Sequence, residues 1–457
     1  MTTDPVHWIA ACVAVVLWLI VCVAVAIFSA RARRADRART EAFGGGGSDA
    51  TLIAYASQTG FAEELALMTA RALTEAGQAA RVVSFADLEL DMLTAAKRAL
   101  FVVATTGEGD APDSAGRVLR RVLDRDATLP VLTYGMLALG DRSYKDYCGF
   151  AHAVDGWLKR SGAAPLFDLV EVDDADPEAI RHWQHQLNAV TGSNAEPDWT
   201  PPLYDRWKLV ERRLLNPGSP GGEAFHLAFE PIEHTPAWSA GDIVEIGVPA
   251  PEGERPAARE YSIASLPADG RLELLVRLMR HPDGTPGLAS GWLTGQAGLG
   301  DEVAMRVRVN RGFHGPAALT PMILIGNGTG LAGLRGHLKA RALLQDGQGD
   351  AWLMFGERTA AHDAFHDAEL KAWLASGVLT RLDRTFSRDA GDGRYVQAVI
   401  AEQAHEVRRW IDRGAVIYVC GSLEGMASGV HTALEEALGA DRVIALSEAG
   451  RYRRDVY

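Results

Sequence analysis

The chain has 457 residues, of which 47% are hydrophobic and 23% charged, and its formal net charge is −13. This length exceeds one ordinary core, so two or three domains are expected, and the composition is that of a globular protein. The acidic balance argues against nucleic acid as a partner, since binding a phosphate backbone needs clustered Lys and Arg. The four cysteines form neither a CxxC pair nor a dense framework, which argues against a metal site or a disulfide scaffold.

The run from Trp8 to Phe28 has no charged residue, and five arginines follow it between Arg31 and Arg39. A helix of this length would cross the roughly 30 Å hydrocarbon core of a bilayer. Because cationic residues flank the cytoplasmic end of membrane helices, we expect a single-pass protein of the inner membrane with its catalytic domains in the cytoplasm. A cleaved signal peptide is the alternative, but its cationic residues would precede the apolar run.

Periodicity divides the rest of the chain into three folded segments. Strands alternate with helices from about Thr51, short alternating strands follow Trp207, and the strand–helix alternation returns from about Pro321. The first and third patterns predict doubly wound α/β domains, and the second predicts an antiparallel barrel or sandwich. The predicted segments are a transmembrane anchor at 1–30, a basic and glycine-rich linker at 31–50, folded domains at 51–190, 207–318 and 319–457, and a linker at 191–206.

Three polar loops follow strands of the first α/β domain, at the edge of the sheet where ligands bind. In the first loop, hydroxyls precede a helix and suit a phosphate, although Thr59 could serve only as a helix cap. In the second, Gly107 and Gly109 let the backbone approach a flat ring, and in the third Tyr144 offers an aromatic face. These features together indicate a site for a phosphorylated, planar ligand.

The three loops read SQTGFAEE at 57–64, TTGEGD at 105–110 and LGDRSY at 139–144. They resemble the FMN loops of the flavodoxin domain in NADPH-dependent diflavin reductases, which implies that residues 57–60 hold the FMN phosphate and Tyr144 stacks on the isoalloxazine. Two departures are Phe61, where a hydroxyl residue is frequent, and Thr106, where some members carry a second stacking tyrosine. The implied FMN-binding residues are Ser57, Gln58, Thr59, Gly60, Thr105, Thr106, Gly107, Gly109, Gly140, Asp141 and Tyr144.

Two stretches of the second domain, REYSIAS at 259–265 and GLASGWL at 287–293, resemble the FAD site of the ferredoxin–NADP reductase family. The resemblance implies that Arg259 and Ser290 contact the pyrophosphate, that Tyr261 packs against the flavin and that Ser262 lies near flavin N5. Gly287 and Ala289 belong to the small-residue helix start that suits the pyrophosphate.

The third domain carries the features of a nicotinamide nucleotide site. A lone glycine-rich turn is a weak signal, but the GNGTG sequence at 326–330 stands where this family places its dinucleotide loop, which implies roles for Gly328, Thr329 and Gly330. The stretch with Ser387, Arg388, Arg394 and Tyr395 resembles the family's site for the 2′-phosphate of NADPH. Gly393 stands where a Lys is usual, and whether Arg394 replaces that Lys stays open.

Four residues are candidates for the hydride-transfer step. Cys420 could be an inert core residue at a strand end, but Cys420-Gly421-Ser422 resembles the family's Cys-Gly motif beside the nicotinamide. The terminal RYRRDVY at 451–457 resembles that of sulfite reductase flavoproteins. This resemblance implies that Ser262, Cys420 and Asp455 surround the reacting atoms and that Tyr457 covers the FAD ring.

The resemblances together predict an α/β multidomain protein with a flavodoxin-like domain, an antiparallel β-barrel FAD domain and an α/β NADP-binding domain. Its expected function is to pass electrons from NADPH through FAD and FMN to a haem or other one-electron acceptor protein. A membrane-bound electron-carrier module served by another reductase and a non-redox flavin sensor are the alternatives.

Two features bear on the acceptor and on domain placement. The acidic string at 171–178 is either a solvated surface loop or a docking face for a basic acceptor, whose identity stays open. The stretch from Trp207 to Arg259 is too short for the helical connecting region usual in diflavin reductases, so the two flavin domains must be positioned differently here.

Overall fold

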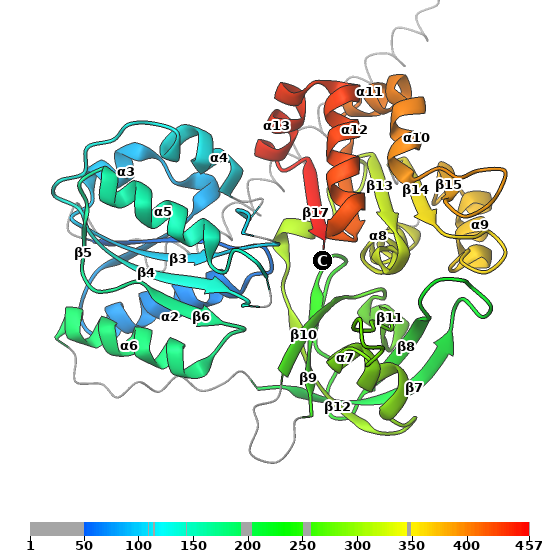
Figure 1. Cartoon of the computed structure of the whole chain (residues 1–457), viewed down its shortest axis with the longest axis horizontal. Helices are drawn as coiled ribbons and strands as arrows, with labels where there is room; N and C mark the ends of the chain where they lie inside the picture. Colours follow the sequence, from blue (N-terminus) through cyan, green and yellow to red (C-terminus); the bar gives the residue numbers. More distant parts are fainter. Residues whose placement is uncertain are drawn as a thin grey trace, which may run out of the picture.

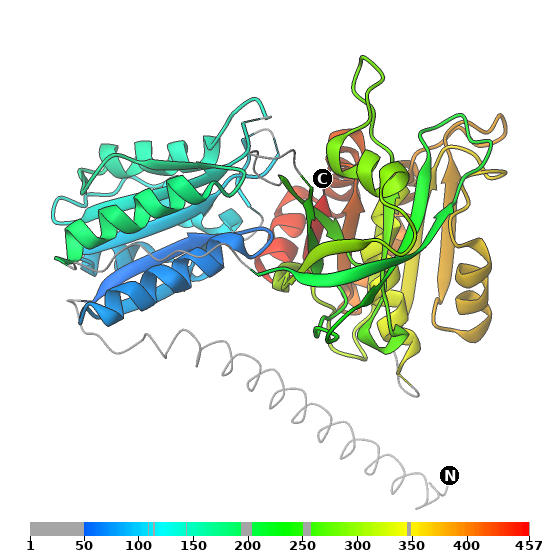
Figure 2. The same ribbon diagram turned by 90° about the horizontal axis from the view of Figure 1, so that it is seen from below.

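The computed structural model describes residues 50–107, 109–112, 115–142, 144–192, 203–249, 257–344 and 349–456. Two bodies of secondary structure lie side by side (Figure 1). Residues 50–192 form the first body around one sheet, and the residues from 203 onward form the second body around two further sheets. Seen from below, the two bodies meet along one junction (Figure 2).

The sheet of the first body is parallel, with the strand order β2-β1-β3-β4-β5 and with β6 also paired to β4. Its strands are β1 (Thr51–Ala56), β2 (Ala80–Ser84), β3 (Arg98–Ala104), β4 (Thr133–Gly140), β5 (Ala164–Pro165) and β6 (Val170–Asp173). The helices are α2 (Phe61–Glu75), α3 (Leu90–Ala95), α4 (Gly116–Val118), α5 (Gly149–Arg160) and α6 (Pro177–Thr191). This arrangement is the doubly wound fold that the alternation predicted.

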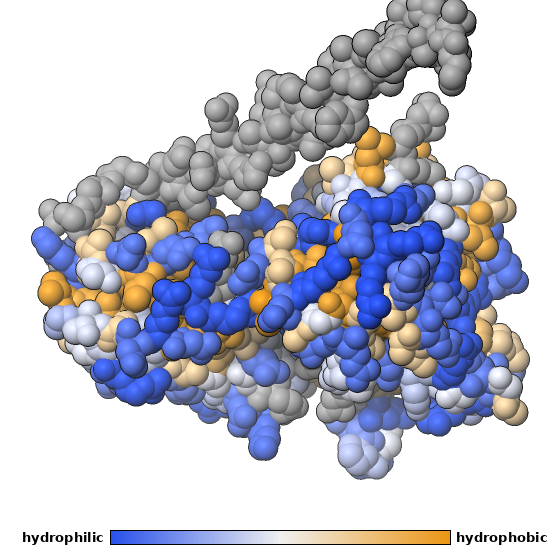
Figure 3. Space-filling model, turned by 90° about the horizontal axis from the view of Figure 1, so that it is seen from above, coloured by the Kyte–Doolittle hydropathy of each residue, from blue (hydrophilic) through white to orange (hydrophobic). Residues whose placement is uncertain are grey.

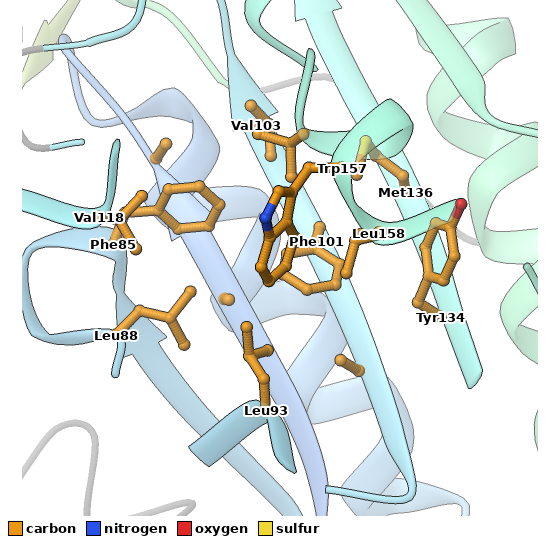
Figure 4. Packing of buried hydrophobic residues seen from close by; sticks show 14 of the residues in the cluster. Phe85, Leu88, Leu93, Phe101, Val103, Val118, Tyr134, Met136, Trp157 and Leu158 are labelled. Carbon is orange, nitrogen blue, oxygen red and sulfur yellow. The ribbon is translucent and has the colours of Figure 1, made fainter. Parts of the chain in front are cut away.

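Successive side chains of these strands enter two separate cores because strand residues alternate between the faces of a sheet. Ile53 packs under α2 and α6, whereas its neighbours Leu52 and Ala54 face α3, α4 and α5. In the second of these cores, Phe101 of β3 packs with Phe85 and Trp157 (Figure 4). The Phe85 and Phe101 rings meet edge to face with their centroids 6.3 Å apart. The two cores fix the carboxyl ends of β1, β3 and β4 at one edge.

The second sheet is antiparallel and begins the second body, with the order β10-β9-β12-β7-β8-β11. Its strands are β7 (Asp205–Leu214), β8 (Ala224–Pro231), β9 (Ile243–Val248), β10 (Ala257–Ser262), β11 (Leu272–Arg277) and β12 (Glu302–Arg308). The end strands β10 and β11 contact each other, so the sheet curls towards a barrel. The helical turns α7 (Leu288–Gly291) and η5 (Trp292–Gln296) precede β12.

The third sheet is parallel, with the order β15-β14-β13-β16-β17. Its strands are β13 (Met322–Asn327), β14 (Ala351–Glu357), β15 (Arg381–Phe386), β16 (Val416–Gly421) and β17 (Tyr452–Val456). The helices are α8 (Leu331–Ala342), α9 (Asp367–Ser376), α10 (Val396–Glu402), α11 (Ala404–Asp412), α12 (Ser428–Leu438) and α13 (Ala440–Glu448). One of its cores includes Ala264, Leu275 and Phe313 from the second domain, so the second and third sheets share buried apolar residues.

The predicted inner-membrane localisation requires a correction. Among the described residues, no helix is both long and apolar enough to cross a bilayer. Even α2 and α6, with 15 residues each, would extend only about 22 Å, against a hydrocarbon core of about 30 Å. The run from Trp8 to Phe28, on which the prediction rested, lies outside the described residues, as do nearly all of 31–50 and most of the predicted linker at 191–206.

No helical connecting region separates the flavin-type domains in the described part of 203–262, where β8 and β9 alone stand between β7 and β10. Instead the first body contacts the second directly through ion pairs between oppositely charged side chains. These pairs are Glu63–Arg311 at 2.5 Å, Glu64–Arg306 at 2.7 Å, Arg120–Glu448 at 2.8 Å and Asp174–Arg259 at 3.2 Å. Domain placement in this chain therefore depends on contacts between the domains themselves.

Candidate functional site

A cavity of about 850 Å³ lies at the junction between the two bodies. From the first body, the three polar loops after β1, β3 and β4 line it. From the second body, strands β9, β10 and β12 line it, together with Trp292 and Val456. Residues predicted to bind FMN and residues predicted to bind FAD thus open into the same space.

The first loop turns sharply between β1 and α2. Gly60 adopts a left-handed conformation with φ of 87°, and its backbone N–H donates to the Ser57 hydroxyl at 2.9 Å. No side chain caps α2 by a hydrogen bond among the described residues, so the simple capping role considered for Thr59 is not what the structure has. The amides at the start of α2 and the loop hydroxyls provide the donor set that an anionic phosphate requires.

The second and third loops approach each other closely. Gly109, with φ of 126°, lies so near Asp146 that an added Cβ would come within 2.6 Å of the Asp146 Cβ. Gly140 is also closely packed, since a Cβ there would lie 2.9 Å from the Cys148 sulfur. Both glycines are needed for close backbone packing beside the cavity. The remaining predicted residues that line the cavity here are Thr105, Thr106, Gly107, Asp141 and Tyr144.

Two side chains of these loops suit a planar ligand with polar edges. The Thr105 hydroxyl is buried and has no hydrogen-bond partner among the residues that the structure describes. Buried polar atoms are normally paired, so this hydroxyl is suited to a ligand that offers a donor or acceptor. Tyr144 lines the same cavity and is 43% exposed, which leaves part of its ring available for stacking.

On the FAD side, Arg259 and Tyr261 lie on β10. Arg259 lines the cavity and pairs with Asp174 of the first body at 3.2 Å. Tyr261 packs against the core of the antiparallel sheet, and burial raises the pKa of its hydroxyl to about 12. Arg259, which is predicted to contact the FAD pyrophosphate, therefore also takes part in the contact between the domains.

The predicted helix start at 287–290 forms a compact turn. The buried Ser290 hydroxyl accepts a hydrogen bond from the Met279 backbone N–H at 3.1 Å. A Cβ on Gly287 would lie 3.0 Å from that same hydroxyl, while Ala289 is buried within the turn. Ser290 thus stabilises the turn, in addition to any contact that it makes with a ligand.

Ser262, Cys420 and Asp455 come together from three separate strands. The Ser262 hydroxyl donates to the Asp455 carboxylate at 2.6 Å, and the Cys420 sulfur lies 3.7 Å from the same oxygen and 4.0 Å from the Ser262 oxygen. All three are buried, and burial raises the pKa of Asp455 above its ordinary value. Burial, and next the Asp455 charge, raise the pKa of the Cys420 thiol well above its ordinary value. Tyr457, the fourth predicted catalytic residue, lies outside the described residues.

One glycine of the dinucleotide loop and one of α8 pack closely against Cys420. A Cβ on Gly330 would lie 2.1 Å from the Cys420 carbonyl oxygen. A Cβ on Gly333 would lie 3.2 Å from the Cys420 sulfur and 3.6 Å from the Ser262 Cβ. The sequence analysis did not predict a role for Gly333. The signal available in the sequence was that a small residue stands one helical turn after the GTG sequence. The Gly328–Gly330 turn connects β13 to α8 and places Thr329 at the helix start.

The residues predicted to select NADPH lie where β15 ends and α10 begins. Ser387 and Arg388 are held by backbone hydrogen bonds from their N–H groups to the carbonyls of Glu357 and Arg358, both at 2.8 Å. Arg388 and Tyr395 are exposed. Arg394 is exposed too, but its guanidinium contacts Asp392 at 2.5 Å and Glu402 at 2.7 Å. Two carboxylates therefore already neutralise Arg394.

Comparison with known proteins gives matches to both parallel-sheet domains. The flavodoxin family model matches residues 53–183, and the oxidoreductase NAD-binding domain model matches residues 324–432. A sulfite reductase (NADPH) flavoprotein alpha-component from Vibrio vulnificus is 27% identical, with 89% of this chain and 87% of the relative covered. The corresponding proteins of Photobacterium profundum and Thiocapsa roseopersicina are 26% and 28% identical, over 89% and 84% of this chain.

The alignment with the Vibrio vulnificus protein extends over 538 positions, more than the 457 residues of this chain, so the relative contains insertions that this chain lacks. The match nevertheless covers 89% of this chain, in which the flavodoxin part precedes the NAD-binding part. This order of domains, the convergence of their loops on one junction and the two family models lead to one conclusion: the chain is similar, over most of its length, to flavoproteins of the NADPH-dependent diflavin reductase family.

Proposed function

We propose that this chain carries electrons from NADPH, through FAD bound on the antiparallel sheet and FMN bound on the flavodoxin sheet, to a haemoprotein. The observation that carries the proposal is the shared cavity, which the three FMN-type loops and strand β10 line together. The two flavins and the nicotinamide would supply the redox chemistry, and the protein would supply orientation, electrostatics and exclusion of water.

At the hydride-transfer step, we assign positioning and charge support to Ser262, Cys420 and Asp455. The hydrogen bond from Ser262 to Asp455 fixes the hydroxyl direction, and the buried carboxylate is able to respond to charge that develops next to it. Gly333 leaves the space over Cys420 and Ser262 that a side chain would fill. We assign Tyr457 to the flavin face by resemblance.

At the FMN site, we assign the phosphate to the loop at 57–60 and to the amino terminus of α2. The Thr105 hydroxyl and the backbone around Gly107 and Gly109 would contact the ring edge, and Tyr144 would stack on its face. These assignments agree with the orphaned Thr105 hydroxyl and with the exposed part of the Tyr144 ring.

For the nucleotide, we assign the 2′-phosphate to Ser387 and Arg388 rather than to Arg394. A guanidinium that two carboxylates already hold has less to offer a dianion than one that faces solvent. Arg358, whose carbonyl accepts a hydrogen bond from the Arg388 backbone, is the second cation near this position.

The acceptor is proposed from the relatives, which are flavoprotein components of sulfite reductase. The acidic string does not support a dedicated docking face, because four of its five acids make contacts within the chain. These are Glu171 with His152 at 2.9 Å, Asp173 with the Arg142 backbone N–H at 2.9 Å, Asp174 with Arg259 at 3.2 Å and Asp176 with the Glu178 backbone N–H at 3.1 Å. On the face shown in Figure 3, apolar residues lie among hydrophilic ones.

The proposal is tested on the purified full-length chain. We expect FMN and FAD in equal amounts, bleaching of the flavin absorbance by NADPH, and rapid reduction of ferricyanide or cytochrome c. Flavins that NADPH does not bleach, but that a separate reductase does, would instead support the carrier-module alternative. Bound flavin that neither NADPH nor a separate reductase reduces would support the alternative of a non-redox flavin sensor.

A further inference from the structure

Arg308 reaches from the antiparallel sheet to the loop that we assign to the FMN phosphate. It is the last residue of β12, and its side chain is buried. Its guanidinium donates to the Thr59 carbonyl oxygen at 3.1 Å and lies over the Phe61 ring, 5.4 Å from the ring centroid. One buried cation thus contacts the residues on both sides of Gly60, at the start of α2.

The position of Arg308 is fixed from its own side of the junction. Glu245 of β9 accepts a hydrogen bond from its guanidinium at 3.2 Å, and Glu260 of β10 is a second carboxylate partner. Glu260 also accepts a hydrogen bond from the Thr59 side chain. Because Glu260 lies between Arg259 and Tyr261 on β10, this cluster connects the FAD strand to the FMN loop.

Backbone packing gives the loop little freedom where Arg308 holds it. A Cβ on Gly60 would lie 2.8 Å from the Val309 carbonyl oxygen, so the loop rests directly on the residue after β12. On its other side, the Gln58 side chain donates to the Arg454 carbonyl oxygen at 2.9 Å. The loop at 57–60 is therefore both a ligand loop and the surface on which the flavodoxin domain docks.

We infer that Arg308 is a positioning residue for the FMN site, acting from the FAD domain through Thr59, and that FMN binding and domain docking stabilise each other. The inference rests on the proposed function, because it takes the loop at 57–60 to hold the FMN phosphate. Since docking and phosphate binding require the same loop conformation, each lowers the ordering cost of the other. This linkage performs part of the work that a connecting region would otherwise do.

Arg306 provides a matched control on the same strand. It lies two residues from Arg308 and also crosses the junction, where its guanidinium contacts both carboxylate oxygens of Glu64 at 2.7 Å. Glu64 lies in the first turn of α2 and not in the loop. Loss of Arg306 therefore removes an ion pair between the domains without removing a contact to the residues at 57–60.

The experiment measures FMN affinity in the full-length chain with FAD retained, by calorimetric titration of FMN into protein from which FMN has been removed. We expect Arg308→Gln to weaken FMN binding about tenfold or more, the range for loss of a buried hydrogen bond from a charged group. Arg306→Gln should change the affinity by less than about twofold, as expected for a partly exposed ion pair. Equal losses in the two variants, or no loss in Arg308→Gln, would overturn the inference.

A second measurement on the unmodified chain covers the case in which Arg308→Gln does not fold. If docking and FMN binding are linked, adding FMN must slow amide hydrogen exchange in β12, at residues 302–308, which belong to the other domain. Exchange in β12 that FMN leaves unchanged would contradict the linkage. An unmodified chain that binds no FMN at all would defeat the proposed function instead, so the two failures are distinguishable.

Discussion

The Gln58 side chain donates a hydrogen bond to the Arg454 carbonyl oxygen at 2.9 Å, although 396 positions separate the two residues. This bond joins the first loop of the flavodoxin sheet to β17, the strand that carries Asp455, and Figure 1 shows β17 at the junction of the two bodies. The arrangement therefore places the FMN-type loop next to the strand that completes the Ser262, Cys420 and Asp455 cluster. Disturbing the junction should affect transfer between the flavins before it affects reduction by NADPH.

The ion pair between Glu64 and Arg306 offers a direct test of this expectation. Each reversal alone, Glu64→Arg or Arg306→Glu, places like charges across the junction and should slow electron transfer between the flavins about threefold to tenfold. The double reversal restores opposite charges and should recover most of the rate. Stopped-flow absorbance after NADPH addition measures both steps, and high salt should slow the second step more than the first. A double reversal as slow as its parents would mean that the pair does not guide docking.

Nucleotide choice is tested by a pair of arginines that differ in their partners. Arg388→Ala should raise the KM for NADPH about tenfold and change that for NADH by less than about twofold, because NADH has no 2′-phosphate. Arg394→Ala should have the smaller effect, because Asp392 and Glu402 already hold that guanidinium. Steady-state KM values for both nucleotides decide the assignment. The reverse ranking, with Arg394→Ala the more damaging, would place the 2′-phosphate at Arg394.

The buried Asp455 side chain should destabilise the folded protein when it is ionised. Burial raises its pKa, so the folded protein binds this proton more tightly than the unfolded chain does. The stability gained from protonation is therefore present at low pH and is lost as the pH rises through the folded-state pKa. Asp455→Asn should melt above the unmodified protein at pH 8, with a difference that shrinks towards pH 4, while flavin reduction by NADPH slows about tenfold or more. Thermal melting at both pH values checks the sign.

Ser262→Ala provides the contrasting variant. It removes the 2.6 Å hydrogen bond but leaves the buried carboxylate, so it should destabilise the protein at pH 8 by about 1–3 kcal/mol. Equal and opposite shifts are not required, but the two variants should move the melting temperature in opposite directions at pH 8. A loss of stability in both would show that the Asp455 carboxylate is a net stabilising group.

The parts of the fold that sequence reasoning could reach are those with a local or periodic signal. Hydroxyl and glycine residues after β1, β3 and β4 predicted converging loops, because the carboxyl ends of parallel strands share one edge. The resemblance at the terminal RYRRDVY likewise implied that Asp455 would approach Ser262, and their side chains are 2.6 Å apart. Both predictions depended on short sequence segments that lie at the ends of regular strands.

The contacts between the domains had no such signal. Arg308 is one cation in an alternating strand, and nothing near it in the sequence indicates Thr59, which is 249 positions away. The acidic string suggested a docking face because the sequence does not show its partners, one of which, Arg259 for Asp174, lies in another domain. A Cβ on Gly333 would crowd Cys420 and Phe313, each at 3.2 Å, and a constraint set by distant residues is not visible in one sequence.

Gly330 should be the least replaceable glycine of the dinucleotide loop for steric reasons. A Cβ at this position would lie 2.1 Å from the Cys420 carbonyl oxygen and 2.5 Å from the Gly421 Cα, and both are backbone atoms that no side-chain rotation can move. Gly330→Ala should therefore destabilise the third domain by about 2–4 kcal/mol and shift β16, which carries Cys420.

Gly295 provides the matched control, since it has no positive φ and an added Cβ would meet nothing within 4 Å. Gly295→Ala in the helical turn η5 should be neutral or stabilising by about 0.5–1 kcal/mol, through the lower entropy of the unfolded chain. Urea denaturation gives both free energies of unfolding, and the rate of flavin reduction by NADPH reports the displacement of Cys420. If Gly330→Ala matched Gly295→Ala in stability and in the rate of flavin reduction, β16 would be able to shift without destabilising the protein. The close approach to Cys420 would then not explain the glycine at position 330.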